Sequence, residues 1–282
     1  MVANHVTTLL PCYPRGREDG CRTLSHKDKV REEFTRQAEA FAGLRELHSR
    51  ERIERLVKAI NPASDARALE IATGPGHVAM ALAERCREVV GVDITDAPLA
   101  IAERTRRERG LANVRFQRAD ADQLPFADGE FEVVLCRFAF HHFEDPAIPL
   151  REMTRVCCAG GHVAVEDLAA SEIPERAEFH NRFERLRDTS HTRALPMSEL
   201  LRIFGEQGLE TEAVYTGDLV QPLEGWLANS QTPPDRAAEI RAMLSRDERE
   251  DLSGTRPFHH DGEMFFTEKT VCIVARRLVP RA

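Results

Sequence analysis

Periodic apolar positions predict two helices near the start of the chain. Two sets of four residues follow the i, i+3, i+4, i+7 spacing of one helix face, and the second set ends at Asn61-Pro62: Phe34, Gln37, Ala38 and Phe41, then Ile53, Leu56, Val57 and Ile60. We therefore expect two N-terminal helices within residues 27–62. Residues 1–26 show no such period and are rich in Pro, Gly and scattered charges, which predicts a disordered or loosely packed tail.

From Ala66 onward, short β-rich runs alternate with amphipathic segments. The pattern predicts strands near 67–72, 88–93, 113–118, 131–136 and 161–166, and helices near 76–86, 96–109 and 146–157. Such alternation is typical of parallel strands joined by crossover helices, here in one domain over residues 27–282 with its core at 63–168. In these sheets ligands bind beyond the carboxyl ends of the strands.

After Asp167 the pattern departs from a simple α/β repeat. We expect helices around Phe179–Leu186 and Leu200–Phe204, a strand at 209–215, two further helices and a last strand at 270–277. The insertions at 169–196 and 217–262 would emerge near the ligand-binding edge. They are the candidate substrate cap.

Composition narrows the possible partners. The 282 residues are 42% apolar and 30% charged with a net charge of -8, which disfavours a nucleic-acid substrate because phosphates are bound mainly by Lys and Arg. The seven cysteines form no C-x-x-C pair, the start lacks the features of a signal peptide, and no run approaches the ~20 apolar residues of a membrane span. We therefore expect a cytoplasmic protein without a membrane or nucleic-acid partner, and leave its oligomeric state open.

The turn after the first strand carries the main functional signal. Residues 68–76 read Ala-Leu-Glu-Ile-Ala-Thr-Gly-Pro-Gly, where small residues allow a ligand close to the backbone at the start of a helix. Glycine spacing leaves two alternatives open, because Gly74, Gly76 and Ala79, with Asp93 following at about the ~20-residue interval, also fit the dinucleotide motif of a nicotinamide-dependent oxidoreductase. Glu70 argues against the dinucleotide alternative, because it is an acid at a strand end where a dinucleotide site usually has an apolar residue.

Four further segments follow that turn in order. They are Val90–Ile94, Ala119–Ala121 with Gln123–Phe126, Phe131–Cys136 with Phe140–Phe143, and Arg155–Gly161. Together the five segments resemble the motifs of class I S-adenosylmethionine-dependent methyltransferases, most closely the type 11 branch, which is similar to the ubiquinone/menaquinone-biosynthesis methyltransferases. Ala72 replaces the first glycine of that family's loop, a swap we expect to be mild.

The resemblance implies a Rossmann-like fold with a mostly parallel seven-stranded sheet, an antiparallel last strand and helical cap insertions. It also implies a cofactor site made by Glu70, Ala72, Thr73, Gly74, Gly76, Asp93, Ile94, Asp120, Ala121 and Cys136. Asp93 would bind the ribose hydroxyls, Asp120 the adenine amino group, and Glu70 would hold the loop. In similar enzymes the N-terminal helices close over the cofactor, although the same stripes would also pack on a sheet.

The implied reaction transfers a methyl group to an oxygen, nitrogen or carbon atom of a small molecule, and alignment would supply much of the rate. His141 and His142 are the candidate catalytic bases, with structural hydrogen bonding as the alternative. His191 is a further possible substrate contact, with a solvent-facing side chain as the favoured alternative. Cys136-Arg137 stands where metal-dependent catechol-type relatives carry an aspartate, so we expect no metal. A binding protein or sensor without methyl transfer is the non-enzymatic alternative.

Overall fold

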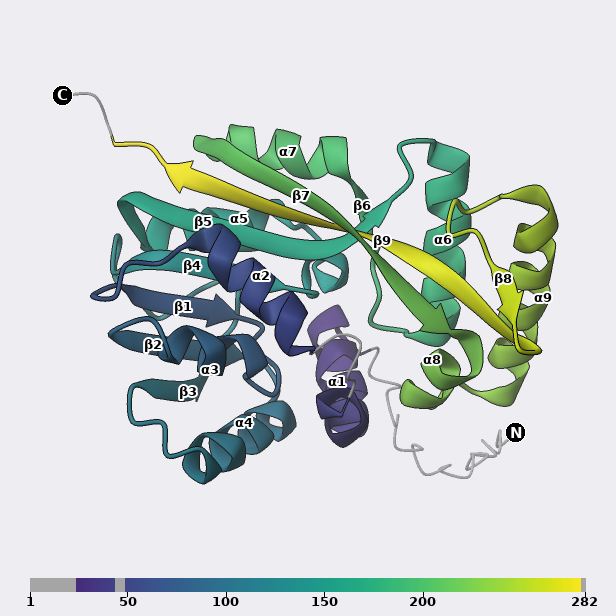
Figure 1. Ribbon diagram of the computed structural model, residues 1–282, viewed down its shortest axis with the longest axis horizontal. Helices are drawn as coiled ribbons and strands as arrows, with labels where there is room; N and C mark the ends of the chain where they lie inside the picture. Colours follow the sequence, from purple (N-terminus) through teal and green to yellow (C-terminus); the bar gives the residue numbers. More distant parts are fainter. Residues whose placement is uncertain (1–23, 44–48, 280–282) are drawn as a thin grey trace, which may run out of the picture.

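A twisted β-sheet with helices on both faces forms the centre of the computed structural model, which describes residues 24–43 and 49–279 (Figure 1). The strand order is β3-β2-β1-β4-β5-β9-β7. β1 to β5 are mutually parallel, and β9 runs antiparallel between β5 and β7. The strand bounds are β1 Arg67–Ile71, β2 Glu88–Asp93, β3 Val114–Arg118, β4 Phe131–Arg137, β5 Cys157–Ala170, β7 Leu209–Pro222 and β9 Glu263–Arg277. This is the predicted mostly parallel seven-stranded arrangement, to which β6 (Leu195–Pro196) and β8 (Phe258–His260) add short edges.

Helices cover the two faces of the sheet through separate apolar clusters. One face packs against α5 (Ala147–Val156) and α7 (Met197–Glu206), the other against α2 (Arg50–Ile60) and α3 (His77–Ala83). α4 (Asp96–Glu108) joins β2 to β3. These elements lie within a few residues of their predicted positions, because each strand is a short apolar run and each helix carries one apolar stripe.

The last strands are longer than the sequence predicts. β7 pairs with β9 from Leu209 opposite Arg277 to Pro222 opposite Phe265, with one register shift between Thr211 and Ala213. Gly217 and Asp218, at the predicted start of the second insertion, continue the ladder, and Asp218 forms an ion pair with Lys269 across it. The second insertion therefore begins after Pro222, not at 217.

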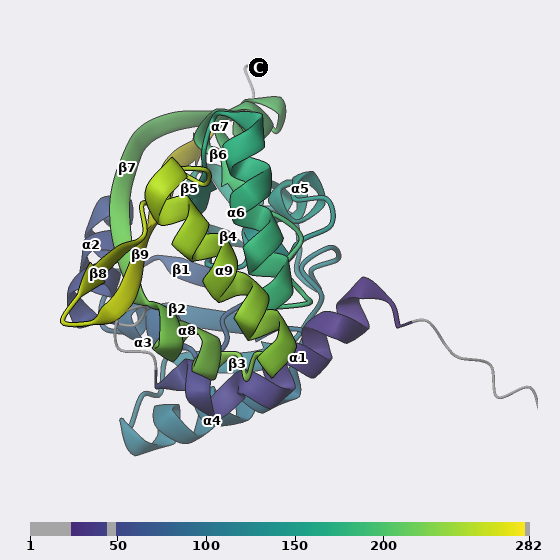
Figure 2. The same cartoon turned by 90° about the vertical axis from the view of Figure 1, so that its right-hand side faces the viewer.

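Both insertions meet where β7 ends and β9 begins (Figures 1 and 2). α6 (Pro174–Arg187), α8 (Leu223–Asn229) and α9 (Pro234–Glu250) share one apolar cluster with β9. Its largest members are Phe183, Trp226 and Phe266, whose rings meet edge to face. The two predicted cap segments thus build one subdomain-like unit.

The sequence left open whether the two N-terminal helices cover the ligand-binding edge or pack on the sheet, and the structure places one helix in each position. α1 (His26–Ala42) begins inside the predicted tail, whose first 23 residues lie outside the described part. It crosses the carboxyl edge of the parallel strands (Figure 1), and Nε2 of His26 lies 2.6 Å from the carbonyl oxygen of His142. α2 instead buries Ile53, Val57 and Ile60 against the sheet. Only α1 is placed to cover a ligand at that edge.

Candidate active site

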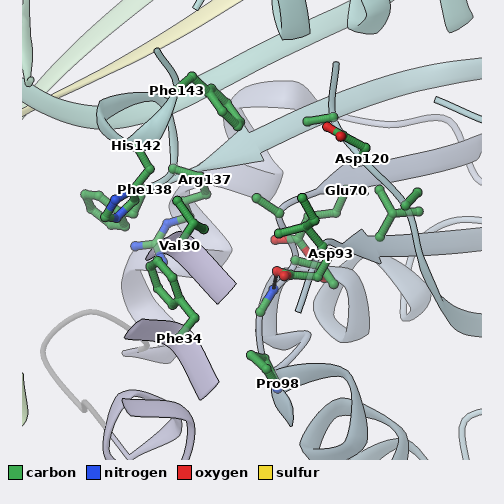
Figure 3. Close-up of a pocket in the computed structure, with 18 of the residues that line it drawn as sticks. Val30, Phe34, Glu70, Asp93, Pro98, Asp120, Arg137, Phe138, His142 and Phe143 are labelled. Atoms are coloured by element: carbon green, nitrogen blue, oxygen red, sulfur yellow. Dashed lines mark hydrogen bonds between the residues drawn. The ribbon is translucent and has the colours of Figure 1, made fainter. Parts of the chain in front are cut away.

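A cavity of about 210 Å³ lies beyond the carboxyl ends of β1, β2 and β4, beneath α1 (Figure 3). Nine of the predicted site residues line it: Glu70, Ala72, Thr73, Gly74, Asp93, Ile94, Asp120, Ala121 and His142. Figure 3 shows Glu70 and Asp93 close together on one side, with Arg137, Phe138 and His142 on the other. The topology therefore gathers residues from distant segments in one cleft, as expected for a parallel sheet.

Glu70 holds the loop that follows β1. Its buried Oε2 accepts hydrogen bonds from Oγ1 of Thr73 at 2.6 Å and from the backbone nitrogen of Ala79 in α3 at 2.8 Å. Burial raises the pKa of Glu70 to about 7, although both donors oppose the shift. The side chain thus fixes the loop geometry, in the role that the sequence favoured.

Asp93 joins the ends of β1 and β2. One carboxylate oxygen accepts the N–H of Gly74 and the other the N–H of Thr95, each at 2.9 Å. Burial raises the pKa of Asp93, and the N–H donors partly offset that effect. The N-cap of α4 is Thr95, so Asp93 does not cap the helix. Each oxygen keeps acceptor capacity for a ligand hydroxyl.

Gly76 and Cys136, predicted as cofactor contacts, do not line the cavity. Gly76 is the N-cap of α3 with φ 78°, and a Cβ there would come within 2.5 Å of the Phe116 ring, so it serves close packing. Cys136 faces the core, because side chains alternate along β4, and within β4 only Arg137 lines the cavity. Ala72 has φ 50°, so its substitution for glycine leaves a strained backbone and is not mild.

Asp120 also contacts α1. Lys27 Nζ lies 2.7 Å from Asp120 Oδ2 and 2.6 Å from Asp122 Oδ2. Lys27, Val30 and Phe34 of α1 line the same cavity. The sequence did not identify these residues as site components, since only the docking of α1 brings them there.

The adjacent histidines point into different environments. His141 Nδ1 lies 2.5 Å from Oδ1 of the buried Asp167, and His141 lines a smaller cavity of about 60 Å³ that adjoins the first. Burial would lower the pKa of His141, but the Asp167 carboxylate raises it overall. His142 borders both cavities, and its Nδ1 lies 3.0 Å from the Ser190 carbonyl oxygen. Burial and the neighbouring His141 lower the pKa of His142 to about 4, so it is neutral at pH 7.

His191 is buried, not solvent-facing as the sequence suggested. Its Nε2 lies 2.8 Å from Oδ1 of Asn181, whose side chain also binds the Ala194 backbone. It lines neither of the two cavities. The structure therefore gives His191 a structural contact in the cap.

Known proteins match both the sequence and this arrangement. The family described as "Methyltransferase domain" matches residues 69–165. The uncharacterized methyltransferase YcgJ of Bacillus subtilis is 33% identical over 212 residues, which cover 75% of this chain and 84% of that protein. The crystal structure of YcgJ superimposes with a TM-score of 0.77 at 30% identity, covering 82% of this chain and 99% of YcgJ. A demethylmenaquinone methyltransferase of Thermus thermophilus is 46% identical over 101 residues, 35% of this chain and 46% of that protein.

The chain belongs to the S-adenosylmethionine-dependent methyltransferases. This result confirms the resemblance, the Rossmann-like fold class and the predicted cofactor. It also decides between the two alternatives that glycine spacing left open, in favour of the methyltransferase. In the described part of the chain no helix is both long and apolar enough to cross a membrane.

The methyltransferase's cavity fits S-adenosylmethionine chemically. Asp93 offers a carboxylate to vicinal hydroxyls, and Ile94, Pro98 and Phe143 offer apolar surface to a flat base. Arg137 adds a cation that the sequence analysis overlooked: its side chain is 4% exposed, and its Nε donates to Glu166 at 2.6 Å. The sequence does carry a signal for Arg137, because it is an arginine at the end of an apolar strand, and a buried charge requires a partner or a ligand.

Proposed function

We propose that this methyltransferase binds S-adenosylmethionine in the cavity of about 210 Å³ beneath α1 and methylates a small molecule in the cytoplasm. The convergence of Asp93 and the buried Arg137 on one cleft carries the proposal, since the cofactor presents two ribose hydroxyls at its centre and a carboxylate at its methionine end. S-adenosylmethionine supplies an electrophilic methyl carbon on a sulfonium. The methyl transfer needs no metal at the strand end where Cys136 and Arg137 stand.

The acceptor would occupy the adjoining smaller cavity. Its lining combines apolar and aromatic side chains with a few polar groups: Phe34, Gln37, Phe138, His141, His142, Leu168, Arg187, Asp188, Leu219, Gln221, Trp226 and Glu268. Such a lining suits a partly apolar metabolite with one or more polar positions. The similarity to demethylmenaquinone methyltransferases supports a small-molecule acceptor.

His141 is the better placed of the two histidines to accept a proton from an oxygen or nitrogen acceptor. Asp167 fixes the orientation of its ring, as expected for a general base, whereas His142 is engaged by Ser190 and is weakly basic. His142 would separate the two cavities and help to position the reactants.

The experiment incubates the full-length protein with S-adenosylmethionine and a metabolite extract, and follows S-adenosylhomocysteine. Thermal unfolding with each cofactor provides the binding control, because a ligand at ~100 times its dissociation constant stabilises by about 2.7 kcal/mol. Product release with stabilisation by S-adenosylmethionine supports the proposal. Tight binding without product across extracts would favour a sensor, and stabilisation by NADH alone would overturn the cofactor.

A further inference from the structure

One cluster of buried ionisable side chains has no place in the methyl-transfer site. His180 and Glu184 lie four residues apart on one face of α6, and Glu268 faces them from β9. Their side chains are at most 2% exposed. Among the described residues, this is the group of His, Cys, Asp or Glu whose ligand atoms converge, all within 4.8 Å of one another.

The converging atoms are not hydrogen-bonded. Nε2 of His180 lies 3.7 Å from Oε1 of Glu184 and 4.0 Å from Oε1 of Glu268, beyond hydrogen-bond distance, and all three atoms are buried without such a bond. The other oxygen of each carboxylate is engaged elsewhere. Gln221 Nε2 donates to Oε2 of Glu268 at 3.1 Å, and Arg187 Nη1 lies 3.6 Å from Oε2 of Glu184. The neighbours thus orient one free acceptor from each carboxylate towards His180.

This spacing matches a cation between the three atoms. Ligands about 2.1 Å from a tetrahedral Zn²⁺ lie about 3.4 Å apart. The separations of 3.7 and 4.0 Å from His180 Nε2 would therefore shorten by about 0.3 to 0.6 Å on binding, and the converging atoms all lie within 4.8 Å of one another. Two buried carboxylates also carry a large desolvation cost unless a positive charge offsets it.

We propose that His180, Glu184 and Glu268 bind a divalent transition-metal ion, Zn²⁺ or Mn²⁺. One imidazole nitrogen and two carboxylate oxygens suit these ions better than Mg²⁺, which prefers oxygen and keeps its waters. The site lies in the cap and is separate from the strand end at Cys136, so it departs from the sequence prediction of no metal without creating a catechol-type site.

The position gives the ion a role beside the acceptor. Glu268 and Gln221 line the smaller cavity, together with His141 and Trp226. The ion would tie α6 of the cap to β9 behind that cavity wall, and an oxygen atom of water or of the acceptor would complete its coordination. The role of the ion beside the acceptor rests on the proposed function, whereas the metal site itself does not.

The test measures metal binding by the full-length protein. After chelator treatment and dialysis, calorimetry with ZnCl₂, MnCl₂ and MgCl₂ is combined with elemental analysis of retained metal. We expect one equivalent of Zn²⁺ or Mn²⁺, bound at least 10-fold more tightly than Mg²⁺. Glu184→Gln and Glu268→Gln should each weaken that binding at least 100-fold, and the exposed Glu175→Gln on the same helix should leave it unchanged.

Gln221→Leu separates orientation from ligation. It removes the donor to Glu268 but no ligand, so affinity should fall by about 10- to 100-fold. Circular dichroism of each variant reports folding. If the variants do not fold, the visible spectrum of Co²⁺ added to the wild-type protein decides: a protein-bound, low-coordinate spectrum supports the site, and the spectrum of the hydrated ion overturns it.

Absence of metal uptake by the wild-type protein would overturn the proposal, as would uptake unchanged in folded Glu184→Gln and Glu268→Gln. S-adenosylmethionine affinity, measured on the same samples, keeps the two proposals distinct. Metal binding without cofactor binding would contradict only the proposed function, and cofactor binding without metal binding would contradict only this inference.

Discussion

Asp93 Oδ2 lies 2.9 Å from the backbone nitrogen of Gly74 and accepts its hydrogen bond. The acid that ends β2 therefore also holds the loop that follows β1. Because the other oxygen accepts the N–H of Thr95, one carboxylate fixes the backbone on both sides of the place proposed for the ribose. If the ribose binds there as proposed, loop order and cofactor affinity are coupled through this residue.

Replacement of Asp93 by Ala should weaken S-adenosylmethionine binding by about 100-fold or more, because two hydrogen bonds to a charged acceptor are lost at about 1.5–3 kcal/mol each. Calorimetry measures the change, and circular dichroism checks that the fold is retained. The control is Asp96→Ala, an exposed acid at the start of α4 whose ion pair with Arg118 lies at the surface. Unchanged affinity in Asp93→Ala would contradict the placement of the ribose.

Ala72→Gly should stabilise the protein. Ala72 has φ 50°, a conformation that costs an alanine about 1–2 kcal/mol, against about 0.5–1 kcal/mol of extra chain entropy lost by a glycine. We expect a net gain of up to about 1 kcal/mol in the free energy of unfolding, measured by urea denaturation. Ala238→Gly, at an exposed position inside α9, should instead lose about 1 kcal/mol. Equal losses in both variants would contradict strain at Ala72.

The parts of the fold with a local cause could be predicted from the sequence. The runs ending at Ile71, Asp93 and Cys136 are short and apolar, and each is followed by a loop and an amphipathic helix, so strand positions and the shared ligand edge followed directly. The same logic placed Glu70 and Asp93 in one cleft. Cys136 is the exception, because alternation along β4 turns its side chain towards the core.

Features that depend on contacts between distant segments could not be predicted in this way. Lys27 reaches Asp120 only because α1 docks across the sheet edge. Likewise, β7 continues through Gly217 because this residue pairs with Thr270 of the distant strand β9. Glu268 has no local signal that places it beside His180, since α6 and β9 are joined only by the tertiary fold.

Glu70→Gln should change how stability depends on pH. The pKa of Glu70 rises from 4.5 to about 7 on folding, so between these values the folded protein keeps a proton that the unfolded chain has released. Stability contributed by this group therefore falls as pH rises from about 4.5 to 7, by about 3 kcal/mol in total. Urea denaturation across this range should show that fall in the wild-type protein relative to Glu70→Gln. A flat difference between the two proteins would refute the shifted pKa.

Arg137 should contribute to cofactor binding through the carboxylate of the methionine moiety. Since removing Arg137 alone leaves Glu166 buried without its ion pair, the variant combines Arg137→Gln with Glu166→Gln. We expect about 10- to 100-fold weaker binding of S-adenosylmethionine and unchanged binding of 5′-methylthioadenosine, which lacks the amino-acid portion. Glu166→Gln alone is the control and should retain affinity for both. Equal losses for both ligands would assign Arg137 a structural role.

Asp167→Asn should lower the pKa of His141, measured by NMR of its imidazole. In the folded wild-type protein the Asp167 carboxylate raises that pKa above 6.5, so the imidazolium stabilises the fold below this pH and the contribution is lost as pH rises through the raised pKa.

The unprotonated His141 ring, which a general base requires, predominates only above the raised pKa. Methylation of a weakly acidic acceptor should therefore increase with pH, and Asp167→Asn should move that increase to lower pH while reducing kcat, because the ring loses its orienting partner. Glu175→Gln, at an exposed acid of α6 that lines neither cavity, should leave both profiles unchanged. A pH profile that does not move in Asp167→Asn would exclude His141 as the base and leave it a structural residue.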